Sequence, residues 1–207
     1  MGDTVTSADV SEAGRLRTLL VGLDGACMDV LGDFFDDGSV PNIRGVFDGG
    51  VGGDIESQIP PWTASAWPSI YTGVNPGKHG VFDFLTFDGY DWDVVNRTHV
   101  REYALWELLS ERGLSSVVVN VPVTHPPRPF DGALVPGYTA PDDPTCHPVG
   151  LLEELRDEIG DYRVYSPVPS DASVEESLEG YRDLVRMRGA AFRYLVERVD
   201  PDFGFVQ

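Results

Sequence analysis

Two stretches of the chain carry oxygen-bearing side chains at positions where they can bind an anion or a metal ion. Thr63 follows a Pro-Pro corner and precedes small and aromatic residues, so it is predicted to lie at or near the N-terminus of a helix. The free N–H groups and the positive dipole at that end can hold an anion such as phosphate. The alternative is that Thr63 only caps the helix, because threonine is a favoured capping residue.

Asp24 ends an apolar run, residues 19–23, that is typical of a buried strand in a parallel sheet. Ligands of open α/β sheets bind at the carboxyl ends of the strands, which is where Asp24 is expected to lie. A carboxylate there suits a divalent cation. The alternative is that Asp24 caps a short helix beginning within residues 26–31.

Three sequence blocks then occur in order: VGLDGACMDVL at residues 21–31, TASAWPSIYTGVNPGKHGVFDF at 63–84 and NVPVTHPPRPFDGALVPGYTAP at 120–141. Together they resemble the alkaline phosphatase superfamily and, within it, the type I phosphodiesterase/nucleotide pyrophosphatase-like group. The resemblance implies an α/β fold with a mostly parallel central sheet flanked by helices. It also implies two divalent metal ions, zinc or else manganese, with Asp24 and Thr63 as metal ligands and Thr63 as the nucleophile.

By the same resemblance, the function would be metal-dependent hydrolysis of small-molecule phosphate esters of the phosphodiester or nucleotide pyrophosphate type. The intermediate would be a phosphothreonine at Thr63, because a bound cation can activate an otherwise weak hydroxyl nucleophile. The candidate substrate contacts are Lys78, His79, Asn120 and His125, the last of which is otherwise an exposed loop histidine.

Other activities of the superfamily stay open, namely a phosphomonoesterase, a phosphomutase or a sulfatase-like enzyme. Sulfatases mature a Cys or Ser within a Cys-x-Pro-x-Arg-type motif, and neither Cys27 nor Cys146 lies in one. A non-catalytic binding module is the rival from a different class.

The chain departs from the resemblance in two respects. Ala66 stands three residues after Thr63, where nucleotide pyrophosphatases have an asparagine that holds a phosphate oxygen. The Asp and His motifs that supply most metal ligands in the family would follow the strand at 203–207. We therefore expect residues 18–207 to be the N-terminal part of a catalytic domain, inactive alone, after a flexible acidic tail at 1–17.

Composition limits the class of partner. The net charge is −19, and Lys78 is the only lysine among 207 residues. Such a surface repels nucleic acids and anionic membranes. It predicts adaptation to high salt, as in haloarchaeal proteins, the alternative being an ordinary acidic cytosolic protein. No apolar run is long enough to span a bilayer, and two distant cysteines predict free thiols in a reducing, cytoplasmic environment.

Apolar periodicity and turn residues predict the remaining elements. The long helix from Ser173 to about Val199 begins with a capping box, Ser173 with Glu176. Its arginines either touch substrate or lie on a solvated face. We expect strands at about 18–23, 116–121, 134–136, 162–165 and 203–206, helices at 43–47, 101–112 and 149–159, and a hairpin within 82–93.

Overall fold

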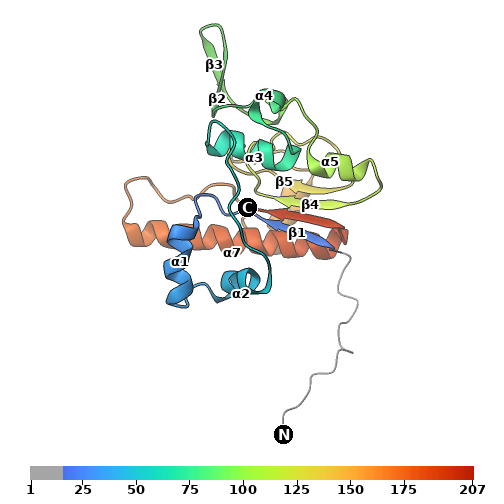
Figure 1. Ribbon diagram of the computed structural model, residues 1–207. Coiled ribbons are helices and arrows are strands. Elements are labelled where there is room, and N and C mark those ends of the chain that lie inside the picture. The colour runs from blue at the N-terminus through green and yellow to red at the C-terminus, as the bar shows by residue number, and fades with distance from the viewer. Residues whose placement is uncertain (1–15) are drawn as a thin grey trace.

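The computed structural model describes residues 16–207, so the predicted tail at 1–17 lies almost wholly outside the described residues. These residues form a mixed α/β fold around a parallel sheet with the strand order β1-β6-β4-β5 (Figure 1). The strands are β1 (Thr18–Val21), β4 (Ser116–Val119), β5 (Gly132–Val135) and β6 (Phe203–Val206). The predicted strands at these four places are confirmed, with β6 at the expected bounds.

The strands end level with one another. Val21 pairs with Val206, Val206 with Val119, and Val119 with Val135. The segments that follow the strands therefore leave from one edge of the sheet, the carboxyl edge, where open α/β sheets bind ligands.

Alternate residues of the buried strands face two separate hydrophobic cores, as the two-residue period of a strand requires. Val118, Leu134 and Phe205 belong to one core, together with aromatic residues of α3 (Thr63–Thr72) and α5 (Leu105–Ser110). Val117, Val119 and Val135 belong to the other, with α6 (Leu151–Ile159) and α7 (Val174–Val199). Helices thus cover both faces of the sheet (Figure 1).

The long helix α7 begins as predicted. Ser173 is its N-cap and accepts a hydrogen bond from the N–H of Glu176, whose carboxylate accepts one in return from the N–H of Ser173. The shorter helices are α1 (Met28–Asp36), α2 (Pro41–Gly49) and α4 (Pro76–His79), with a 3₁₀ turn at Arg97–His99. None of the described helices combines the length and the apolar character needed to cross a membrane.

The prediction that the first strand is buried was wrong. Leu19 is 49% exposed and Val21 is 56% exposed. The reason is that, among the described strands, β1 lies at the edge of the sheet and pairs only with β6. The equally apolar β4 lies between two strands and under helices on both faces. An apolar sequence is compatible with a buried strand, but the elements that pack beside the strand determine whether it is buried.

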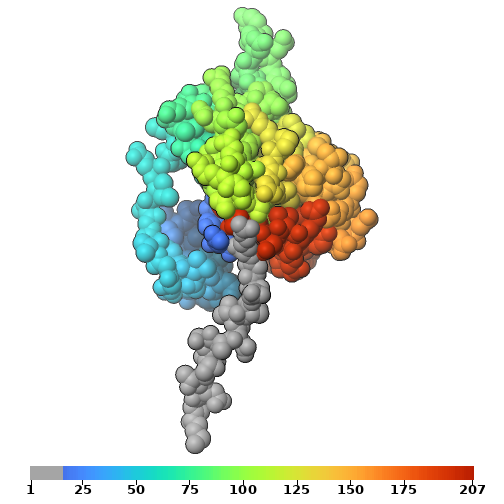
Figure 2. All heavy atoms as spheres, turned by 90° about the vertical axis from the view of Figure 1, so that its right-hand side faces the viewer, coloured from blue at the N-terminus to red at the C-terminus, as the bar shows by residue number. Residues whose placement is uncertain are grey.

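Two further predictions have opposite outcomes. The hairpin is present as β2 (Leu85–Asp88) and β3 (Asp91–Val94), and it projects from the body of the protein (Figure 2). The prediction of a strand at 162–165 was wrong. This segment pairs with no described strand, and Tyr162 packs into the hydrophobic core that also contains residues of α7.

Candidate active site

Thr63 and Asp24 meet at the carboxyl edge of the sheet. Thr63 Oγ1 lies 3.4 Å from Asp24 Oδ1, although the two residues are 39 positions apart in the chain. Thr63 is the first residue of α3 and follows the N-cap Trp62, which has no side-chain capping bond. Asp24 does not cap α1 either, since the N-cap of that helix is Cys27. The capping alternatives therefore do not describe either side chain.

Trp67 holds the other oxygen of the same carboxylate. Its indole Nε1–H donates to Asp24 Oδ2 over 3.3 Å. Trp67 lies four residues after Thr63, so both side chains project from the same face of α3. One helix face thus contacts both carboxylate oxygens. This role of Trp67 was not predicted from the sequence, where its four-residue spacing from Thr63 was the available signal.

The close packing of Trp67 depends on Gly22. A Cβ at Gly22 would lie 2.3 Å from Cη2 of the Trp67 ring, far inside van der Waals contact. Gly22 is anchored by its own N–H, which donates to the carbonyl of Val206 over 2.9 Å. The glycine two residues before Asp24 is therefore a packing requirement, because it leaves room for the indole that orients the carboxylate.

We expect Gly22→Ala to lower the free energy of unfolding by about 1–3 kcal/mol, because the extra methyl overpacks the site. Urea denaturation followed by circular dichroism measures this. Gly32→Ala is the matched control: a Cβ there meets nothing within 4 Å, and Gly32 lies inside α1, so alanine should raise stability by up to about 1 kcal/mol. Equal effects of the two substitutions would contradict the packing role of Gly22.

Asn120 brings a third polar side chain to the same edge. It directly follows β4 and has a φ of 62°, in the left-handed region that few residues other than glycine adopt. Its Nδ2–H₂ donates to the backbone carbonyl of Gln207 over 3.3 Å and also contacts the Gln207 side-chain oxygen. Its Oδ1 is buried and has no hydrogen-bond partner among the described residues.

Asp24, Thr63 and Asn120 line one cavity of about 710 Å³. This size is within the range of small-molecule sites and exceeds what a phosphoryl group alone would fill. Its polar lining includes tyrosines, serines and a single arginine, which come from the loop before α7 and from α7 itself: Tyr165, Ser166, Ser170, Tyr181 and Arg188.

None of the other predicted substrate contacts lines this cavity. His79 is fully buried, with Nε2 2.9 Å from Ser69 Oγ and Nδ1 accepting the N–H of Val81. Burial lowers its pKa, which favours the neutral ring. Lys78 is exposed on α4. His125 lines an adjoining cavity, which shares three aromatic lining residues with this one but does not include Asp24 or Thr63, and its Nε2 accepts the N–H of Thr145.

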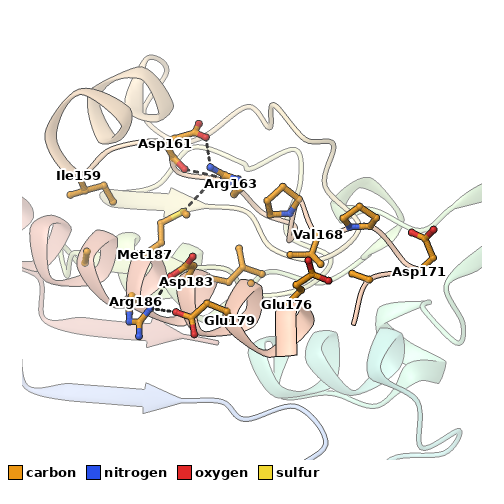
Figure 3. A pocket seen from close by; sticks show the side chains of 16 residues that line it. Ile159, Asp161, Arg163, Val168, Asp171, Glu176, Glu179, Asp183, Arg186 and Met187 are labelled. Carbon is orange, nitrogen blue, oxygen red and sulfur yellow. Dashed lines mark hydrogen bonds and ion pairs between the residues drawn. The ribbon is translucent and has the colours of Figure 1, made fainter. Parts of the chain in front are cut away.

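A larger hollow lies alongside but holds none of the predicted site residues. Its volume is about 950 Å³, and it lies between the first half of α7 and residues 161–172 (Figure 3). Its rim is mostly acidic, with two arginines that pair with neighbouring carboxylates, Arg163 with Asp161 and Arg186 with Glu179 and Asp183. Volume therefore does not mark the candidate active site; the meeting of Asp24 and Thr63 does.

Comparison with known proteins identifies the family. The family model of type I phosphodiesterase / nucleotide pyrophosphatase matches residues 18–195. The chain belongs to this family. The matched range includes Asp24, Thr63, Trp67 and Asn120. A search among curated proteins gave no significant match.

Solved structures show the fold of this phosphodiesterase-family chain. Two structures of phosphonoacetate hydrolase from Sinorhizobium meliloti 1021, one in complex with phosphonoacetate and one with phosphonoformate, align with TM-scores of 0.56 and 0.57 at 18% identity. Each alignment covers 93% of this chain and 46% of the other. The chain thus spans about half the length of those proteins. The predicted alkaline phosphatase-like fold is confirmed.

The donor atoms of the site fit part of a divalent metal site. Two oxygens bound to one tetrahedral zinc ion at 2.0–2.2 Å lie roughly 3.3–3.6 Å apart. The 3.4 Å between Thr63 Oγ1 and Asp24 Oδ1 agrees with that separation and is long for a direct O–H···O hydrogen bond. Within residues 16–207, no group of three or more His, Cys, Asp or Glu side chains is arranged to hold a metal ion. Asp24 and Thr63 would therefore be two ligands of a set that needs more.

Proposed function

We propose that this phosphodiesterase-family protein is a metal-dependent hydrolase of small-molecule phosphate esters, with Thr63 as the nucleophile. The 3.4 Å contact between Thr63 and Asp24 at the first turn of α3 is the observation that carries the proposal. A hydroxyl at a helix N-terminus beside a carboxylate combines an attacking oxygen with donors for a phosphate. The preferred substrates are phosphodiesters or nucleotide pyrophosphates.

The chain's own residues account for the first half of the reaction. Thr63 Oγ1 attacks phosphorus, an O–P bond forms, and the bond to the leaving-group oxygen breaks. Asp24 Oδ1, which faces the hydroxyl, is the acceptor nearest to its proton. The N–H groups of Thr63 and Ala64 lie in the first turn of α3, where a helix offers them no acceptor, and can donate to the phosphoryl oxygens. Water then hydrolyses the phosphothreonine.

A divalent cation held by Asp24 and Thr63, zinc or manganese with a second ion of the same kind, would lower the pKa of the hydroxyl and offset charge on the phosphate. The contact with Trp67 provides a readout of this binding. Because the indole donates to Asp24 Oδ2, a cation that engages the carboxylate changes the surroundings of the ring.

We expect Mn²⁺ or Zn²⁺ to bind with a change in tryptophan fluorescence, and Asp24→Asn to weaken that binding by roughly tenfold or more. Isothermal titration of the metal alone gives the affinity. Asp29→Asn is the matched control, since it removes one carboxylate from the exposed surface of α1 nearby. Equal affinities of the two variants would contradict a metal site at Asp24.

The function itself is tested by hydrolysis of aryl phosphodiesters and aryl phosphomonoesters by the metal-supplemented full-length protein. Faster turnover of diesters supports the proposal, and faster turnover of monoesters would move it to the phosphomonoesterase alternative. After acid quenching during turnover, peptide mapping should find the phosphoryl group on Thr63. A phosphoryl group on another residue would overturn the assignment of the nucleophile.

We also propose the salt conditions and the cell compartment in which the protein acts. The net charge of −19 with one lysine supports a protein adapted to high salt and located in the cytoplasm. Cys27 and Cys146 are both free thiols in the structure, which agrees with a reducing compartment.

A further inference from the structure

The arginines of α7 have two kinds of surroundings. Arg182 and Arg186 are exposed and pair with carboxylates of their own helix, Glu179 and Asp183, as Figure 3 shows for Arg186. Exposed ion pairs of this kind are typical of a solvated helix face and contribute little to stability. The solvated-face interpretation of the helix arginines therefore holds for these two.

Arg188 lies on a different face of α7. It follows Tyr181 by seven residues and the buried Leu184 by four, so the three side chains form one stripe along the helix. All three line the cavity that contains Asp24 and Thr63. Arg188 is the only basic side chain, and Asp24 the only acidic one, among the described residues that line it.

Protein groups leave the Arg188 guanidinium incompletely paired. One Nη2–H donates to the carbonyl of Val164 over 3.1 Å. Its Nε is buried and has no hydrogen-bond partner among the described residues, and no carboxylate of residues 16–207 forms a salt bridge with it. Burial lowers its pKa, so the site carries a desolvation cost that an anion would offset. A guanidinium fork suits carboxylates and phosphates.

The loop before α7 packs tightly against the first half of that helix. A Cβ at Gly180 would lie 2.5 Å from Val168 Cγ2 and 2.7 Å from Ser166 Oγ, so the loop before α7 closes directly onto the helix. Ser166 and Val168 line the cavity with Arg188. One wall of the cavity is thus formed by α7 and the loop before it, and Arg188 belongs to this wall, whereas Asp24 and Thr63 come from other elements.

We propose that Arg188 binds a second anionic group of the substrate, a carboxylate or phosphate on the part that does not leave, and so determines specificity for doubly anionic phosphate esters. This inference rests on the proposed function and names its substrate class. The cavity of about 710 Å³ has room for both a phosphoryl group and a further group. Arg188 is the side chain available to pair with that further group, because no other described residue that lines the cavity is basic.

A matched series of substrates tests this inference. Para-nitrophenyl phenyl phosphate is charged only on the scissile phosphate, and its para-carboxyphenyl and para-phosphonophenyl analogues add a second anion while keeping the leaving group. We expect Arg188→Gln to lower kcat/KM for a doubly anionic analogue by roughly 10- to 100-fold, mainly through KM, because a charged hydrogen bond to the bound substrate is lost. The phenyl ester should change less than about threefold, in the range of an uncharged contact.

Controls separate binding from structure. Arg182→Gln removes an exposed charge of the same helix and should leave all three rates unchanged, and Arg188→Lys, which keeps the charge, should recover part of the loss. If Arg188→Gln lowers kcat/KM for only one of the two doubly anionic esters, the inference is supported, and that ester identifies the anion that Arg188 binds. Equal losses on all three esters, or none, would overturn it. If thermal melting shows that Arg188→Gln does not fold, Arg188→Lys becomes the test variant. It should then lower kcat/KM for the doubly anionic esters, to a smaller extent, and leave the phenyl ester unchanged.

Failure of the inference and failure of the proposed function give different results. If the protein hydrolyses none of the esters, the proposed function fails, and binding decides the inference by itself. Isothermal titration of phenyl phosphate and para-carboxyphenyl phosphate should then show tighter binding of the second compound, reduced in Arg188→Gln by roughly 10- to 100-fold. Hydrolysis with no dependence on Arg188 leaves the proposed function in place and overturns the inference.

Discussion

Thr63→Ala should lower kcat for an aryl phosphodiester by roughly 10⁴- to 10⁶-fold, the size of loss seen when an enzyme's nucleophile is removed. In the proposed mechanism, the hydroxyl oxygen of Thr63 forms the covalent bond to phosphorus, and the surrounding groups position that one atom. Asp24 contacts the hydroxyl, and Trp67 holds Asp24 from the same helix face. Steady-state kinetics of the metal-supplemented full-length protein measures the loss.

Two further variants define what Thr63 contributes. Thr63→Ser keeps a hydroxyl on the same backbone position and should retain measurable turnover. Thr72→Ala removes a hydroxyl from the other end of α3, where it donates to the carbonyl of Pro68, and should leave kcat unchanged. Full activity of Thr63→Ala would remove the nucleophile from the proposal, whereas normal folding with lost activity supports it.

Arg97→Met should lower the free energy of unfolding by about 3–5 kcal/mol, because it leaves the carboxylate of Glu107 buried without its partner. Arg97 is 1% exposed and Glu107 is 7% exposed. The guanidinium Nη2 lies 2.7 Å and 2.9 Å from the two carboxylate oxygens. Its nitrogens also donate to the carbonyls of Val100 and Glu102, so the 3₁₀ turn and the start of α5 are joined through this one side chain.

Urea denaturation measures this effect, with Arg186→Met as the control. Arg186 forms exposed ion pairs, so its loss should cost about 0–1 kcal/mol. Arg128, whose Nη1 lies 4.0 Å from Glu107 Oε2, can move closer and keep the loss toward the lower end of the range. The double change Arg97→Met, Glu107→Leu should recover much of the stability. Similar losses in Arg97→Met and Arg186→Met would contradict a dominant role for the buried pair.

Both halves of the candidate site could be predicted from local patterns. Asp24 follows an apolar run of strand length, and Thr63 opens a segment of helix-forming residues after two prolines. That the two side chains would converge was implied by the family resemblance, which made both of them ligands of the metal ions. The structure places them 3.4 Å apart. Their catalytic roles stay proposals.

The contacts that orient and extend the site could not be predicted, because each depends on residues distant in sequence. Trp67 has the spacing of an ordinary core aromatic until the fold places Gly22 against its ring. Arg188 and Arg186 are two residues apart in one helix, but only the packing of the loop before α7 decides which of them faces the cavity. His79 contacts Ser69 through Nε2, and this contact exists only because α4 packs against α3.

The sequence by itself therefore determined most elements and their order: the apolar runs that form strands, the capping box that begins α7, the hairpin and the two motifs at the strand and helix ends. These follow from periodicity and capping, which act over a few residues. Only the tertiary structure decided that β1 is an exposed edge strand, that residues 162–165 form no strand, and which side chains share a cavity with Thr63. Burial and pairing depend on which element lies alongside, and that is a property of the assembled fold.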